Sequence, residues 1–472
     1  MTPKKIASFA LGPIGGALIS LITLPFITWH FSQEDVGRIG MLQITISFAI
    51  LLFSLGLDQA YVRNYHDVQN KPALLRSSIV PSFTLLILIL VIVLSIGLSL
   101  SSLLFGVSSA PLSGLIIVVL ILTFISRFLS LVLRMKEQGV AYSMSQLLTK
   151  LLLFSVVVGI VLLEADTDII NLVAAYVLSS FFVFVLLIWN TKSELMLAYH
   201  SRINKSELRK MLKFGFPLIF GGLAFWGLTA TDKIFLRSLS NFEELGLYSV
   251  SVSFAAAASI LQAIFSTVWA PIVYKWVSTE TNLDKVNKVT KYILAIVILF
   301  FILAGLLSWL ISFFLPSNYK EVRWIVVSCL GYPLLYTLSE TTVVGIGVTK
   351  RSSFSMLASI IAFIINVIGN WLLIPKYGAA GAASSTCFSF FIFFILRTEL
   401  AIYVWKPIPR KLLYTLTSIS VSAAIVFTLW GELIGIWSFL FWAFFLVVWI
   451  ICFFEEIKQT SSFVYKRNRH SV

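Results

Sequence analysis

The chain has 472 residues, of which 59% are hydrophobic and only 12% are charged, and its mean hydropathy is +0.97. Soluble domains average about 45–50% apolar and about 25% charged residues, so this composition excludes an ordinary soluble protein. A net charge of +14 would suggest nucleic-acid binding in a soluble chain. Here the basic residues fall mostly in loops between apolar segments, which favours a membrane protein without a nucleic-acid partner.

About fourteen apolar stretches follow one another along the chain, and each is long enough to cross a bilayer. A hydrocarbon core about 30 Å thick needs about 20 helical residues at 1.5 Å each. The predicted spans are 8–29, 38–57, 79–105, 111–134, 141–163, 168–190, 214–238, 247–270, 289–315, 323–347, 354–374, 379–405, 411–431 and 434–454. The last two are either two crossings or one re-entrant hairpin.

The distribution of basic residues predicts the orientation. With the N-terminus in the cytoplasm, 26 of the 35 Lys and Arg residues fall on the cytoplasmic side and 5 fall outside. Cytoplasmic loops of membrane proteins carry such an excess, so both termini are expected inside the cell. The apolar run after Lys4 and Lys5 is too long for a cleavable signal peptide, so the first span is expected to stay as a helix.

A short internal sequence similarity predicts that the chain consists of two halves. Leu11-Gly12-Pro13 opens the first span and Gly215-Phe216-Pro217 opens the seventh, and similar acidic turns follow at 32–37 and 241–246. Matches this short also arise by chance. If this similarity reflects a repeat, the two copies are parallel and are related by a pseudo-two-fold axis along the membrane normal. Such a repeat places a substrate site between the lobes. The predicted divisions are an N-lobe (1–190), a basic cytoplasmic linker (191–213), a C-lobe (214–405), two further helices (406–454) and a cytoplasmic tail (455–472).

Charged residues within the spans are the main candidates for function, because charge is costly in hydrocarbon. Lys150 lies about nine residues, or ~14 Å, into its span, which is too deep for easy snorkelling. Arg127 lies ~10 Å from the cytoplasmic end of its span, where snorkelling competes with a functional role. Each is a candidate for holding an anion, and the alternative for each is a paired or snorkelling structural cation.

Three more charges interrupt the second half. Asp232 and Lys233 are adjacent and point about 100° apart on a helix, so each is expected to face a different partner. Asp232 is a candidate proton or cation site. Burial disfavours the charged form of a carboxylate, so a buried carboxylate can take up and release a proton. Glu340 is a second candidate, and for both the alternative is a structural ion pair.

Other charges are expected nearer the membrane surface. Arg397 and Glu399 lie close to the cytoplasmic end of their span, and Asp58 and Arg63 flank the cytoplasmic end of the second span. The four histidines are scattered without the spacing of a metal site. The cysteines Cys329, Cys387 and Cys452 fall within spans and are expected to form no disulfide.

No enzyme motif is evident. A Walker sequence and a G-x-S-x-G nucleophile turn are both absent from the sequence. The predicted outside loops are about 5–10 residues long, too short to carry the reacting groups of a periplasmic polymerase or ligase. The sequence therefore favours a transporter over an enzyme.

Several motifs carry a family likeness. The segment NVIGNWLLIPKYGAAGAA (366–383) resembles the span-11-to-12 signature of bacterial polysaccharide transporters, the O-antigen-type oligosaccharide-lipid flippases of the MATE-like superfamily. The matching residues are Asn366, Asn370, Pro375, Gly378, Gly381, Ala382 and Ala383. The segment GLDQAYVRNY (56–65), with Gln59 and Arg63, and the Asp232–Lys233 pair are also similar to this family.

The resemblance implies an all-α membrane fold with two six-helix bundles around a central cavity, plus two C-terminal helices. It implies export of undecaprenyl-diphosphate-linked oligosaccharide across the inner membrane by alternating access, driven by an H⁺ or Na⁺ gradient and without a cofactor. A polysaccharide polymerase is the expected protein partner. A MATE-type drug or cation antiporter is the alternative, and a polymerase or ligase is a more distant one.

Under this hypothesis the interior charges divide into two groups. Cations would hold the diphosphate by charge-assisted hydrogen bonds, and carboxylates would bind the coupling ion. Aromatic rings at Trp226, Trp269 and Tyr336 would stack on sugars, although most membrane aromatics serve packing. The predicted substrate-binding residues are Lys150, Arg127, Arg63, Lys233 and Arg397. The predicted ion-coupling residues are Asp232, Glu340 and Asp58.

Overall fold

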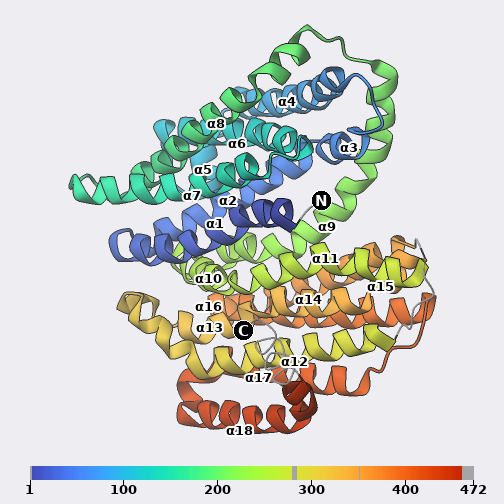
Figure 1. Ribbon diagram of the computed structural model, residues 1–472. Coiled ribbons are helices and arrows are strands. Elements are labelled where there is room, and N and C mark those ends of the chain that lie inside the picture. Colours follow the sequence, from blue (N-terminus) through green and yellow to red (C-terminus); the bar gives the residue numbers. More distant parts are fainter. Residues whose placement is uncertain (1–2, 279–283, 350, 460–472) are drawn as a thin grey trace, which may run out of the picture. The chain divides into compact units, whose positions relative to one another are not determined.

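The computed structural model describes residues 3–278, 284–349 and 351–459, and all regular structure in these ranges is helical (Figure 1). The chain forms two compact units, Met1–Ser253 and Phe254–Val472. The all-α class predicted from the sequence is therefore confirmed. The predicted division into an N-lobe and a C-lobe on either side of 191–213 stays a prediction.

The first unit contains nine whole helices and most of a tenth among its described residues. They are α1 (Pro3–His30), α2 (Gln33–Phe53), α3 (Leu57–Asn64), α4 (Lys71–Ser95), α5 (Leu100–Phe105), α6 (Ala110–Met135), α7 (Gly139–Leu162), α8 (Ile169–His200), α9 (Lys205–Leu239) and α10 (Phe242–Ala255). Most of these helices begin at a side chain that accepts a hydrogen bond from the first turn, such as Ser32, Asn70 and Asn204.

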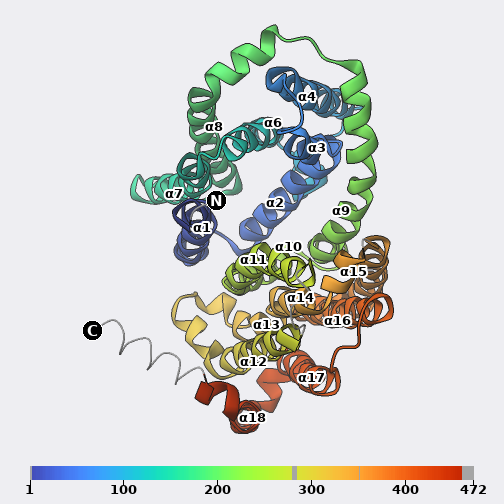
Figure 2. The same ribbon diagram turned by 45° about the vertical axis from the view of Figure 1, so that its right-hand side comes forward.

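The second unit continues with further helices (Figure 2). They are α11 (Ala258–Ser278), α12 (Asp284–Leu307), α13 (Val322–Cys329), α14 (Gly331–Thr342), α15 (Val344–Val348), α16 (Ser353–Val404), α17 (Lys411–Ile434) and α18 (Ile436–Cys452), with short 3₁₀ turns at Ser308–Phe313 and Ser317–Tyr319.

Some predicted boundaries differ from the structure. The predicted linker at 191–213 is mostly helical, because α8 continues to His200 and α9 begins at Lys205; no Gly or Pro interrupts 191–213 to end a helix earlier. The predicted span 79–105 is broken, since Gly97 adopts a φ of 74° after α4 and Ser99 caps a new helix, α5. The spans predicted at 247–270 and 323–347 are also divided, into α10 and α11 and into α13, α14 and α15.

Small residues let α1 and α7 pack closely side by side. Gly12 lies against the backbone of Ser143, Gly15 lies against Leu147, and Gly16 lies against the side-chain stem of Lys150. Both residue numbers rise together along the contact, so the two helices run parallel. Glycines spaced three or four apart form one face of a helix, which is how such close approach arises within membranes.

The helix α2 packs antiparallel along α9. The contacts join Gly40 to the stem of Lys233, Leu51 to Gly222, and the turn glycine Gly56 to the backbone of Gly215. At the opposite end, Gly37 and Gly246 bring the first turns of α2 and α10 into backbone contact. We call this line of contacts the α2–α9 seam.

The long helix α16 is a helical hairpin. Its backbone leaves the helical conformation at Gly378 (φ 49°, ψ −128°), and hydrogen bonds then join its two arms. Asn366 Nδ2 donates to Thr386 Oγ1 at 2.9 Å, and Ser385 Oγ donates to the carbonyl of Asn366 at 3.1 Å. Gly381 allows the second arm to pass the backbone of Leu373. The signature segment 366–383 thus builds the turn, and its two arms match the predicted spans 354–374 and 379–405.

Length and apolar composition allow 11 of the described helices to cross a bilayer, and shorter apolar helices cover Ile14–His30 and Ile436–Cys452. Large apolar side chains such as Leu88, Leu163 and Trp437 are exposed on the protein surface, as expected where lipid replaces water. The chain is therefore a multi-pass membrane protein. The number of fourteen crossings and the pseudo-two-fold axis stay predictions.

Candidate functional site

A buried ion pair lies at the start of α3. The chain turns at Gly56, whose φ is 68°, and this turn places Asp58 in the first turn of the short helix. Arg127 of α6 donates from Nη2 to Asp58 Oδ2 at 3.0 Å, and Ser54 donates to the other carboxylate oxygen at 3.3 Å. Asp58 is buried, whereas the Arg127 side chain is 39% exposed. Arg127 is thus neutralised on one side and accessible on another.

Arg63 lies on the same short helix but has a different neighbour. Its guanidinium group stacks over the Phe214 ring of α9, with 4.1 Å between the guanidinium carbon and the ring centroid. The side chain is exposed, and its position at the membrane surface stays a prediction. The short helix α3 therefore carries one buried carboxylate and one exposed cation.

Lys150 lies in the middle of α7, where its stem contacts Gly16 of α1. Among the described residues the structure shows no acidic partner or hydrogen bond for its ammonium group. A cation in this position is costly unless an anion or water reaches it. Arg127 differs, because it has the acidic partner Asp58.

The adjacent residues Asp232 and Lys233 of α9 are both buried and face different neighbours, as predicted. Asp232 accepts a hydrogen bond from the hydroxyl of Tyr248 on α10. The stem of Lys233 lies against Gly40 of α2, next to the Ser249 hydroxyl, which also contacts Gly40. Lys233 therefore belongs to the α2–α9 seam, whereas Asp232 faces α10.

In the second unit Arg397 and Glu340 pair with each other. Arg397 Nη2 lies 2.8 Å from Glu340 Oε1, and Nη1 donates to Ser339 Oγ at 2.7 Å. The guanidinium carbon also lies 5.2 Å and 5.0 Å from the ring centroids of Tyr336 and Phe393. The Arg397 side chain is therefore buried between α14 and α16, and its expected position near the membrane surface stays a prediction.

The other candidates are structural in character. Glu399 accepts a hydrogen bond from Tyr414 at 2.8 Å and lies 3.4 Å from Arg410, partly exposed as predicted. Trp226 donates to Ser47 of α2 at 3.0 Å, and Trp269 is buried against Phe265. All three cysteines are free, and no group of metal-ligating side chains occurs among the described residues.

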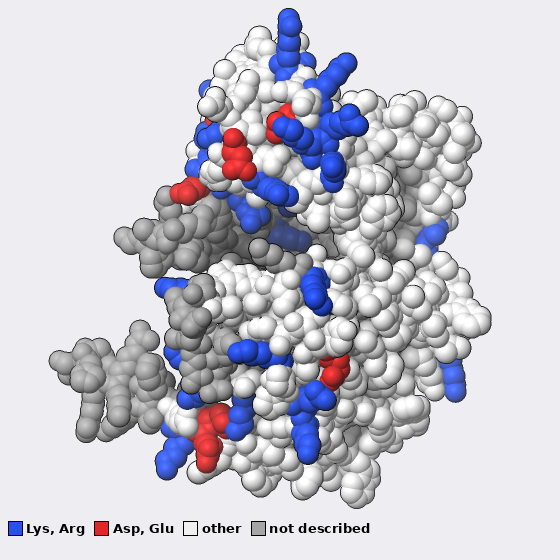
Figure 3. Space-filling model, turned by 90° about the vertical axis from the view of Figure 1, so that its right-hand side faces the viewer, with Lys and Arg blue, Asp and Glu red and all other residues white. Residues whose placement is uncertain are grey.

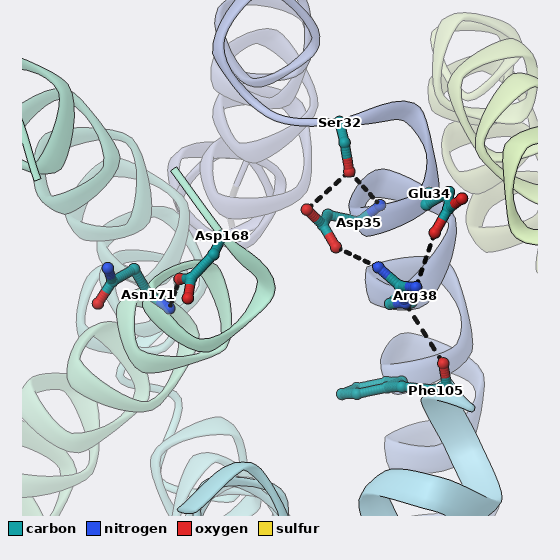
Figure 4. Close-up of polar contacts among 7 residues, drawn as sticks. All are labelled: Ser32, Glu34, Asp35, Arg38, Phe105, Asp168 and Asn171. Atoms are coloured by element: carbon teal, nitrogen blue, oxygen red, sulfur yellow. Dashed lines mark hydrogen bonds and ion pairs between the residues drawn. The ribbon is translucent and has the colours of Figure 1, made fainter. Parts of the chain in front are cut away.

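A charged cluster that the sequence analysis overlooked fixes the start of α2 (Figure 4). Arg38 pairs with Asp35 at 2.6 Å and Glu34 at 2.7 Å, and its Nε donates to the Phe105 carbonyl at the end of α5. The spacings of three and four residues were the signal in the sequence that could have predicted these pairs. Figure 4 also shows Asp168 capping α8 through the backbone of Asn171.

The candidate site residues therefore form separate groups. In the first unit they are the Asp58–Arg127 pair, the exposed Arg63, the lone Lys150 and the buried Asp232–Lys233 pair. In the second unit they are the Glu340–Arg397 pair. Their roles in binding and ion coupling stay predictions.

Comparison with solved structures identifies the fold. The lipid II flippase MurJ in an inward closed conformation is similar to the chain, with a TM-score of 0.59, 16% identity, and coverage of 97% of this chain and 100% of MurJ. A multidrug resistance MATE family transporter of the MOP superfamily, inward-facing, matches with a TM-score of 0.57 and 14% identity over 85% of this chain and 96% of its own. Its outward-facing counterpart matches with a TM-score of 0.54. No curated protein matches the sequence.

Residues 3–277, more than half of the chain, match the family model described as polysaccharide biosynthesis protein. The match includes Asp58, Arg63, Arg127, Lys150 and the Asp232–Lys233 pair, and the likeness to MOP-superfamily structures extends over almost the whole length. The chain therefore belongs to the polysaccharide biosynthesis protein family and has the fold of the MOP-superfamily transporters.

Proposed function

We propose that this protein is a flippase that moves an undecaprenyl-diphosphate-linked oligosaccharide from the cytoplasmic to the outer leaflet of the inner membrane by alternating access. The family match supports a role in polysaccharide biosynthesis, and the fold supports transport across a membrane. The observation that carries the proposal is Lys150, a cation in the middle of an apolar helix without an acidic partner among the described residues.

The chemistry of the substrate explains why such a cation is useful. A lipid-linked diphosphate carries about two negative charges, and a charged headgroup cannot cross hydrocarbon unaided. Hydrogen bonds between an ammonium group and phosphate oxygens are about twice as strong as neutral ones. Lys150 would hold the diphosphate, and the exposed part of Arg127 would assist. Arg63, Lys233 and Arg397 remain candidates for weaker contacts with the same headgroup.

Coupling to an ion gradient is part of the proposal. Asp58 and Glu340 are each held by an arginine, so protonating either carboxylate would free a cation. Asp232 instead accepts from the Tyr248 hydroxyl, and it is adjacent to Lys233 of the α2–α9 seam. Proton or Na⁺ binding at Asp232 would change the charge of this seam, which makes Asp232 our first candidate for coupling.

Replacing Lys150 with alanine is expected to lower export by about 10-fold to 100-fold. The reason is that a hydrogen bond to a charged group contributes about 1.5–3 kcal/mol. The measurement is surface polysaccharide in a deletion strain that expresses each variant, together with the protein level in the membrane. Single repeat units on the carrier should accumulate at the inner leaflet.

The controls are Lys150→Arg, which keeps the charge, and Lys192→Ala, which removes an exposed lysine that stacks on Trp189. Both are expected to export at near wild-type levels. Normal polysaccharide in the Lys150→Ala strain would reject the role of Lys150. Increased drug sensitivity of the deletion strain with normal polysaccharide would favour a MATE-type exporter, and finished polymer left on its carrier would favour a ligase.

A further inference from the structure

A small cavity lies between α12 and α17, and its lining includes none of the candidate site residues. Its volume is about 350 Å³. The lining surface is mostly apolar, and its residues include Asn287, Lys288, Lys291, Leu294, Ile408 and Leu413. A mostly apolar cavity with two lysines among its lining residues suits an amphipathic anion.

The rim is basic. The Lys288 side chain is exposed and has no ion pair among the described residues, whereas Lys291 Nζ lies 2.6 Å from Glu456 Oε1. Arg410 and Lys411 follow directly after the lining residue Pro409. Glu456 and Glu399 are the acidic groups that face these cations, and each is engaged with one of them. Figure 3 shows Lys and Arg side chains gathered on one face of each unit, with fewer acidic ones.

The first turn of α17 supplies a second feature that attracts anions. This helix has 24 residues, and Leu412 and Leu413 of its first turn line the cavity. Its N-cap residue, Arg410, makes no side-chain capping hydrogen bond. The first N–H groups of a helix have no partner within the helix and carry a partial positive charge, so they favour a phosphate.

Aromatic residues indicate the depth of the cavity in the membrane. Lys285, one turn before Lys288, lies over the Trp276 ring at 5.8 Å, and Tyr403 and Trp405 precede the chain segment that lines the cavity. Trp and Tyr concentrate at the level of lipid headgroups. These aromatic residues favour a position of the cavity near the level of lipid headgroups.

We propose that this cavity binds the phosphate headgroup of an anionic phospholipid. Lys288 and the N–H groups of α17 hold the phosphate, and Lys291 contributes its remaining donors. The start of the acyl chains lies against Leu294, Ile408 and Leu413. The bound lipid belongs to the membrane leaflet in which the cavity lies, and it stabilises the packing of α12 against α17. This site requires only that the protein lies in a membrane. Its test is therefore independent of the test of the proposed transport activity.

The test uses the full chain in detergent, titrated with phosphatidylglycerol, phosphatidylcholine or inorganic phosphate, with binding followed by native mass spectrometry and melting temperature. We expect phosphatidylglycerol to bind and to raise the melting temperature, and the other two to do so much less. Lys288→Gln should weaken binding about fivefold, since a lysine near an anionic lipid contributes about 1 kcal/mol. Lys288→Arg should restore it.

The matched control is Lys285→Gln, which removes the same charge one turn earlier on the same helix and outside the cavity lining. It should bind phosphatidylglycerol almost like the wild type. Equal weakening by both glutamine variants would show attraction to general surface charge and would overturn the site. If phosphatidylcholine bound as tightly as phosphatidylglycerol, the site would have no preference for anionic lipid. If inorganic phosphate raised the melting temperature as much as phosphatidylglycerol, the ligand would be a free anion and not a lipid.

Discussion

The Glu340→Gln variant is expected to lose about 3–5 kcal/mol of stability, because it leaves the buried Arg397 guanidinium without its counter-ion. The two side chains are only 14% and 10% exposed, and they join α14 to α16. We expect the melting temperature of the purified protein to fall by about 3–5 °C. A double variant, Glu340→Gln with Arg397→Gln, should recover part of the loss, because neither charge is then left alone.

An exposed ion pair in the same unit provides the control. Lys320 and Glu432 lie 3.7 Å apart with side chains 62% and 65% exposed, and such pairs contribute about 0–1 kcal/mol. Glu432→Gln should therefore melt within about 1 °C of the wild type. If Glu340→Gln melts as high as Glu432→Gln, the buried pair does not hold these helices together.

A second large effect is expected at Gly56. Its φ of 68° disfavours a side chain, and an added Cβ would overlap the backbone of Gly215 at the end of the α2–α9 seam. The left-handed conformation alone costs about 1–2 kcal/mol for alanine. Pushing two backbones apart adds about 1–3 kcal/mol. Gly56→Ala should therefore lower both the melting temperature and the amount of folded protein in membranes.

Gly97 separates the two contributions. Its φ is 74°, but an added Cβ would have no heavy atom within 4 Å. Gly97→Ala therefore carries the conformational cost without the overlap, and it should melt well above Gly56→Ala. Equal melting temperatures for the two variants would mean that the close approach of Gly56 and Gly215 contributes nothing to stability.

The sequence predicted the fold class and most helices because the bilayer imposes a length on each apolar run. It predicted the chain reversal near Gly378 through a family signature. It did not predict the breaks between α10 and α11 or at Val343, because no Gly or Pro marks residues 256–257 or 343. Those breaks arise from tertiary packing, which local propensity does not describe.

The candidate site was predicted as a set of residues but not as a set of contacts. Asp58 meets Arg127 across 69 positions and Glu340 meets Arg397 across two helices, so each contact depends on the rotation of both helices about their axes. One sequence without helix orientations does not contain that information. Adjacent residues are the exception, because helix geometry alone separates Asp232 from Lys233.

The α16 hairpin has a consequence for how the protein is made. Asn366 and Asn370 are fully buried, and Asn370 Nδ2 donates to Asn366 Oδ1 at 3.1 Å while Asn366 reaches Thr386 on the other arm. The first arm inserting alone would take carboxamides into lipid without Thr386, and each unsatisfied polar group costs several kcal/mol there. During synthesis, insertion of both arms as one unit avoids this cost, so we expect the first arm to enter the lipid together with the segment that carries Thr386.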